Sequence, residues 1–119
     1  MVSEILLKSE EELKRFNNVR SRLVKVLENF NKRSDRFVAR LKPELCPSDV
    51  CVGRTIFFEV FVEPKQEADG RYVLISFKYE LISDRKAFTY ILPRMTLSLE
   101  DLQVILSLTQ KLAEAFYQP

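Results

Sequence analysis

Residues 54–81 read RTIFFEVFVEPKQEADGRYVLISFKYEL and have the pattern of two antiparallel strands, 54–63 and 71–81, joined by a hairpin turn. In both strands apolar side chains recur at every second position, which is the spacing of residues on one strand face. Pro64 closes the first strand, and Asp69-Gly70 supplies the positive φ that a hairpin turn requires. The stretch therefore predicts two neighbouring strands of an antiparallel sheet.

The first of these strands does not alternate cleanly between apolar and polar residues. Its apolar face collects Ile56, Phe58, Val60 and Val62. Phe57 and Phe61 fall on the opposite face, where the other residues are Thr55, Glu59 and Glu63. Two aromatic rings on the polar face of a strand require an explanation of their own.

Two further strands extend the hairpin into a four-stranded sheet. Residues 36–42 alternate, with apolar side chains on one face and mainly basic side chains on the other. Residues 86–92 follow a tight turn at Ser83-Asp84-Arg85 and stop at Pro93, which has no backbone N–H to donate. Because the connections are short, the strands are expected to be antiparallel neighbours in a meander.

Helical patterns lie on both sides of the predicted sheet. Ser9 and Glu12 have the spacing of a capping box, so a helix is expected to begin there. Its apolar stripe is Leu13, Phe16, Val19, Leu23, Val26, Leu27 and Phe30. Ser98 and Asp101 form the capping signal of a second helix. The second stripe is Leu102, Ile105, Leu106, Leu112, Ala113 and Phe116, widened by Val104, Leu108 and Ala115.

The predicted fold is a single α+β domain spanning residues 1–119. An N-terminal helix precedes the four-stranded antiparallel meander, and a C-terminal helix follows it. The chain has 119 residues, 46% of them hydrophobic, which suffices for one buried core. Because the C-terminal helix is apolar over much of its circumference, we expect burial on more than one side. Either the first helix and the sheet bury it, or a homodimer forms through Leu106, Leu108 and Leu112.

Several classes of function are disfavoured by the composition. The chain has no histidine, which removes the commonest general base and most zinc sites. It has two glycines, Gly53 and Gly70, so no glycine-rich phosphate loop can form. Cys46 and Cys51 are expected to be loop thiols or a short local disulfide rather than a metal site. We therefore expect no cofactor, no metal and no enzymatic activity.

The sequence also bears on the location of the protein. The longest apolar runs are far shorter than the roughly 20 residues of a membrane helix. The N-terminus has charged residues from Glu4 onward and does not resemble a signal peptide. A cytoplasmic protein without a membrane partner is expected, and its many charges with few glycines favour a thermophilic source.

The face of the sheet opposite the core is the candidate functional site. If both helices cover the apolar face, bases and aromatic rings alternate on the other: Arg36, Arg40, Lys42, Phe57, Phe61, Tyr72 and Lys78. Arg54 lies at the start of its strand, and Phe88 and Tyr90 join the set if their strand has the matching register. Unpaired bases stack on aromatic rings while Lys and Arg neutralise phosphates. The pattern therefore favours binding of single-stranded nucleic acid, DNA or RNA, with little sequence specificity.

The three segments RTIFFEVFVE, RYVLISFKYE and TLSLEDLQVILSLTQKLAEAF together resemble the ThermoDBP-like single-stranded DNA-binding proteins of thermophilic archaea. In that family a cleft lined with aromatics and flanked by bases holds a single strand. The resemblance implies that Phe57, Phe61, Tyr72, Arg40 and Lys78 perform this role here.

Two other readings remain open at the level of sequence. The rings of Phe57 and Phe61 could be buried beneath a helix or a second copy, which would make the chain a protein-interaction or oligomerisation module. The carboxylates on the same face would repel phosphate. A metal-dependent nuclease is the third reading, because Asp49 and Glu63-Pro-Lys65 loosely match an acid followed by an acid-x-lysine triplet.

Overall fold

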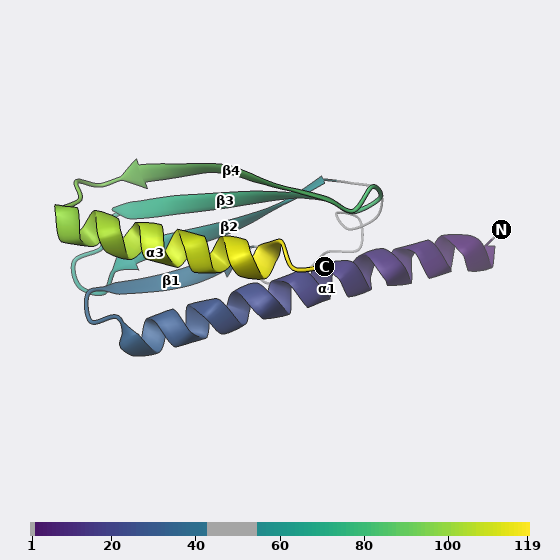
Figure 1. Cartoon of the computed structure of the whole chain (residues 1–119), viewed down its shortest axis with the longest axis horizontal. Coiled ribbons are helices and arrows are strands. Elements are labelled where there is room, and N and C mark those ends of the chain that lie inside the picture. Colours follow the sequence, from purple (N-terminus) through teal and green to yellow (C-terminus); the bar gives the residue numbers. More distant parts are fainter. Residues whose placement is uncertain (1, 43–54) are drawn as a thin grey trace.

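A computed structural model describes residues 2–42 and 55–119, with side chains described from Glu10 onward. The elements follow in the order α1 (Val2–Arg33), β1 (Phe37–Lys42), β2 (Thr55–Pro64), β3 (Tyr72–Glu80), β4 (Arg85–Arg94) and α3 (Leu99–Phe116). The strands form one antiparallel sheet in the order β1-β2-β3-β4, a meander with the two helices beside it (Figure 1). The predicted α+β fold is confirmed.

Both helices pack on the same face of the sheet. Phe58, at the middle of β2, is fully buried and lies between them. Its ring stacks on Phe16 of α1 with the centroids 5.1 Å apart, and it meets Phe116 of α3 edge-on at 6.0 Å. The apolar face predicted for β2 is confirmed, because Ile56, Val60 and Val62 are also buried. Hydrophobic burial on one side of the sheet therefore holds the two layers together.

The first helix is longer than its predicted extent. The helix begins at Val2, so the expectation that it starts at Ser9 is wrong. In the sequence, Val2, Ile5 and Leu6 continue the helical spacing of the apolar residues after Glu12, and this periodicity outweighs the capping signal. With 32 residues α1 is about 48 Å long, at roughly 1.5 Å per residue.

The second helix begins where predicted but is rotated relative to the predicted stripe. The Ser98 side chain accepts a hydrogen bond from the backbone N–H of Asp101 at 3.1 Å, which confirms the cap. The buried residues are Asp101, Ile105, Leu108, Leu112, Ala115 and Phe116. Leu102 and Leu106, assigned to the core, are instead 41% and 49% exposed. The large Phe116 ring, which packs on Phe58 and Phe77, turns this side of the helix toward the sheet.

Side chains from the helices occupy both edges of the sheet. The Asn31 amide of α1 donates to the Ala39 carbonyl at 3.0 Å and accepts from the Ala39 N–H at 2.8 Å, along the free edge of β1. At the other edge the Phe88 N–H donates to the Tyr117 hydroxyl at 2.6 Å. Such contacts reduce the capacity of an edge strand to pair with another chain.

The fourth strand runs further than predicted. It continues through Pro93 to Arg94, so the expectation that Pro93 stops it is wrong. β4 is an edge strand, where a proline costs no ladder hydrogen bond if its nitrogen faces outward. Within residues 2–42 and 55–119, no helix combines the length and apolar character needed to cross a membrane.

The corrected stripe of α3 can be tested by a matched pair of truncations. Leu108→Ala should lower the free energy of unfolding by about 2–5 kcal/mol, because it opens a cavity in the core. Leu106→Ala, on the exposed side of the same helix, should change it by about 0.5 kcal/mol or less. Urea denaturation followed by circular dichroism measures both values. Equal losses for the two variants would contradict the orientation of α3.

Candidate nucleic-acid interface

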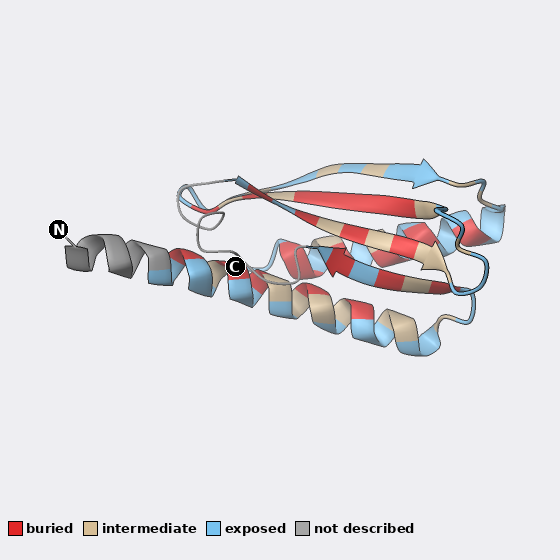
Figure 2. Ribbon diagram, turned by 180° about the vertical axis from the view of Figure 1, so that it is seen from behind, coloured by how far each residue is buried: buried red, intermediate tan, exposed pale blue. Residues whose placement is uncertain are grey.

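The sheet face away from the helices is covered by no helix or strand of the described chain (Figure 2). We call this surface the open face. Two cross-strand rows form its middle, Arg40–Phe61–Leu74–Leu92 and Lys42–Glu59–Ser76–Tyr90. The remaining positions are Val38, Thr55, Phe57, Glu63, Tyr72, Lys78, Glu80, Arg85, Ala87 and Arg94. The open face therefore gathers aromatic and basic side chains from all four strands.

The aromatic rings of the open face are only partly buried. Phe57 is 48% exposed and Tyr90 is 44% exposed, so the alternative that Phe57 lies beneath a helix is wrong. Phe61 is half-buried because the Tyr72 ring lies against it, with the centroids 5.4 Å apart and the planes tilted by 55°. The Lys42 amine lies 5.2 Å from the centroid of Phe61, a cation–π contact. These rings have faces or edges that a ligand can contact.

A β-bulge separates the two aromatic residues of β4. Phe88 pairs with Phe77, whereas Tyr90 pairs with Ser76, which leaves Thr89 as the extra residue. Paired residues point to the same side of a sheet, so Tyr90 belongs to the open face and Phe88 to the helix face. The ring of Phe88 accordingly meets the core residue Phe77 edge-on at 5.4 Å. Of the two predicted site residues, only Tyr90 lies with the others.

Arg36 also lies away from the predicted site. It precedes β1, which begins at Phe37, and its guanidinium forms an ion pair of 2.6 Å with Asp101 at the start of α3. The prediction that Arg36 lies on the open face is therefore wrong. The strand alternation was extended one residue too far, and Arg36 instead pairs with the buried carboxylate of Asp101.

Ion pairs neutralise part of the positive charge on the open face. Arg40 forms a close ion pair with Glu63, and Lys78 lies 3.2 Å from Glu80. The Lys78 amine and then the Ser83 hydroxyl hold the pKa of the Glu80 carboxyl below its usual range. Lys42 and Arg94 have no carboxylate partner within the described part of the chain. The freely available positive charge is thus at the β1 and β4 sides of the sheet.

The end of β4 adds Leu92 to the open face, a residue that the predicted site did not include, and places Arg94 beside it. Leu92 and Arg94 follow the bulge in β4. The face of the sheet on which they lie therefore depends on the position of the extra residue, Thr89. Leu92 is 37% exposed and adds an apolar contact beside Tyr90. In KAFTYIL a regular alternation would put Phe88, Tyr90 and Leu92 together, and no residue type in this segment marks the bulge.

The two described residues of the nuclease reading each have another partner. Glu63 is held by Arg40, and the Lys65 amine donates to the Ser34 carbonyl at 2.5 Å. Asp49, together with Arg54, Cys46 and Cys51, lies outside the described residues. Among the described residues, no group of three or more acidic, cysteine or histidine side chains could hold a metal ion.

Comparison of the chain with protein-family models, curated proteins and solved structures found no significant match. The resemblance to ThermoDBP-like proteins therefore remains an expectation from the sequence, and the geometry of the open face is the structural feature that bears on function.

Proposed function

We propose that the protein binds single-stranded nucleic acid on the open face, without catalysis and with little sequence specificity. The observation that supports this best is the set of partly exposed rings beside bases that lack acidic partners. Apolar and aromatic residues of a soluble protein are rarely left exposed together on one surface unless something binds there. A cytoplasmic location in a thermophilic organism belongs to the same proposal.

The spacing of the rings fits an extended strand of nucleotides. Phe57 and Phe61 are four residues apart on β2, which corresponds to about 13 Å along the strand. Tyr90 lies two strands away from β2, at the level of Glu59 between these two rings. Bases could stack on Phe57, Tyr90 and the Phe61–Tyr72 pair, while Lys42 and Arg94 contact phosphates. A duplex keeps its bases stacked on one another, so it would not use the rings.

The binding test is fluorescence anisotropy of a labelled mixed-sequence single-stranded oligonucleotide at several salt concentrations. We expect binding that weakens with salt by a slope of about −0.7 per phosphate contacted and that resists an unlabelled duplex competitor. Phe57→Ala and Tyr90→Ala should each weaken binding about 5-fold to 150-fold, the loss of one stacked base.

Phe88→Ala is the matched control for these ring substitutions. It removes an aromatic ring of comparable exposure, 41%, from the same strand as Tyr90 but on the helix face. The affinity of this variant should not change. Absence of binding at low salt, or equal losses for Phe88→Ala and Tyr90→Ala, would refute the open face as the binding surface.

The Arg40–Glu63 ion pair leads to a prediction of tighter binding. Glu63→Gln removes a negative charge from the open face and releases Arg40 for a phosphate, so affinity should rise and the salt slope should steepen by about 0.7. Glu28→Gln makes the same charge change on α1, where Glu28 is exposed, and should leave the slope unchanged. A slope that is identical for wild type and Glu63→Gln would show that Arg40 makes no phosphate contact.

A homodimer through α3 is a second proposal, with a surface different from the predicted one. Leu108 and Leu112 are buried in the monomer, so they are not available to a partner. Leu99, Leu102 and Leu106 are exposed on the side of α3 where no charged residue lies. Interface cores are depleted of charge, and the side chains at both sheet edges disfavour pairing through strands.

The dimer can be tested by sedimentation equilibrium at micromolar concentration. Wild type should be dimeric, and Leu102→Glu combined with Leu106→Glu should be monomeric, because the buried charges would lack partners. Val104→Glu, an apolar residue of similar exposure on the side facing α1, should leave the dimer intact. A monomeric wild type would refute this proposal.

A further inference from the structure

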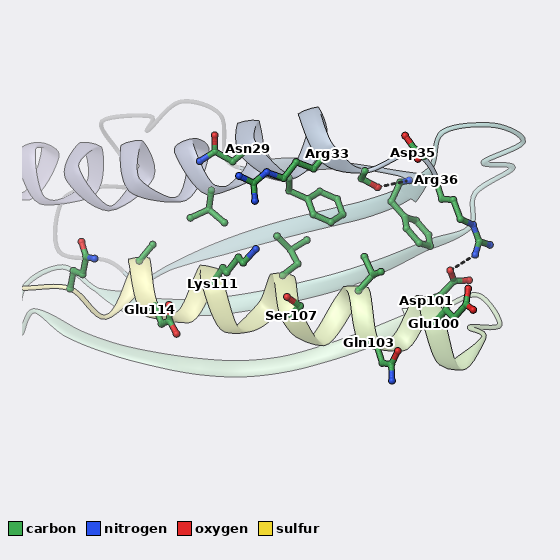
Figure 3. A pocket seen from close by; sticks show the side chains of 18 residues that line it. Asn29, Arg33, Asp35, Arg36, Glu100, Asp101, Gln103, Ser107, Lys111 and Glu114 are labelled. Atoms are coloured by element: carbon green, nitrogen blue, oxygen red, sulfur yellow. Dashed lines mark hydrogen bonds and ion pairs between the residues drawn. The ribbon is translucent and has the colours of Figure 1, made fainter.

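A groove of about 940 Å³ runs between α1 and α3 on the helix side of the molecule (Figure 3). It follows α3 from Asp101 to Gln118, a distance of about 25 Å at roughly 1.5 Å per residue. Its apolar lining is Val26, Phe30, Phe37, Val104, Leu108 and Ala115. The volume lies within the range of small-molecule pockets, about 300–1,000 Å³, and because the other twelve lining residues are polar or charged, the groove is amphipathic.

Two cationic side chains lie on opposite walls of the groove. Arg33 comes from the last turn of α1 and Lys111 from the fourth turn of α3. In Figure 3 their charged ends point toward one another across the groove. No carboxylate of the described chain forms an ion pair with either of them. Facing charges of the same sign are unfavourable, and an anion placed between them would remove this cost.

Most acidic residues of the groove lie at one end of it. Asp101 is buried and paired with Arg36, and Figure 3 places Asp35 and Glu100 at the same end as this pair. Glu114 also lines the groove, one turn of α3 beyond Lys111, and its carboxylate accepts a hydrogen bond from the Gln110 amide at 3.4 Å. Three of the four carboxylates that line the groove therefore lie at one end, and Arg33 and Lys111 face its middle section.

We propose that this groove binds a small amphiphilic anion, an organic acid with an apolar chain. Its acidic head would lie between Arg33 and Lys111, accepting charge-assisted hydrogen bonds from both. Its chain would cover the half-buried Phe30 and Val104, which is 38% exposed. The groove and the open face are on opposite sides of the sheet, so this site is independent of nucleic-acid binding.

Isothermal titration calorimetry with dodecanoate, below the concentration at which it forms micelles, tests the proposal on the full chain. We expect one site per chain, and a loss of affinity of about tenfold or more in Arg33→Gln and in Lys111→Gln, the loss of one charge-assisted hydrogen bond. Lys32→Gln is the control, because Lys32 is exposed in the same helical turn as Arg33 but does not line the groove. Its affinity should equal that of wild type. Thermal melts of each variant verify that the fold is retained.

Three outcomes would overturn the amphiphile site. The first is no binding of dodecanoate to wild type. The second is equal binding of dodecanol, which has the chain without the charge, since this would show that the two cations do not contribute. The third is displacement of dodecanoate by a single-stranded oligonucleotide whose own affinity depends on Arg33 and Lys111, since the groove would then be a nucleic-acid site.

Discussion

The structure depends on one packing constraint, the burial of the Phe58 ring between the two helices. Phe58 has no exposed surface, and it contacts Phe16 of α1 and Phe116 of α3. Because one side chain of β2 meets both helices, the helices must lie on the same face of the sheet. The opposite face then has no covering helix, and the apolar residues that alternate with Phe58 along β2 remain at the surface.

Neighbouring side chains cover part of the apolar surface of the open face. Phe61 and Tyr72 cover one another, Lys42 lies over Phe61, and the smaller Ser76 is enclosed by its larger neighbours. Long amphipathic side chains shield apolar surface while their charges stay in water. Phe57, Tyr90 and Leu92 keep between 37% and 48% of their surface exposed. Some rings of the open face are thus covered by neighbouring side chains and others are accessible. Accessible rings on a firmly packed surface would suit the proposed stacking of unpaired bases.

Much of the candidate site could be predicted because strand alternation is a local property. The positions of Arg40, Lys42, Phe57, Phe61, Tyr72 and Lys78 on one face follow from the two-residue period of β1, β2 and β3. The two-residue period does not predict the face of a residue outside a strand or beyond a bulge. Arg36 lies one residue outside β1, and Thr89 interrupts β4, so Arg36 and Phe88 point to the helix side. A bulge depends on the fit of two strands to one core and has no fixed residue signature.

The sequence by itself determined the element order, the hairpin at Asp69-Gly70, the Ser98 cap and the apolar face of the sheet. Each of these depends on residues within a few positions of one another, whose φ angles, hydrogen bonds or periodicity are decided locally. Only the tertiary structure decided the rotation of α3, the side to which Tyr90 points and the groove between α1 and α3. These features depend on how distant segments share one core: Leu102 and Leu108 are equally apolar, and the position of the Phe116 ring against Phe58 and Phe77 decides which of them is buried.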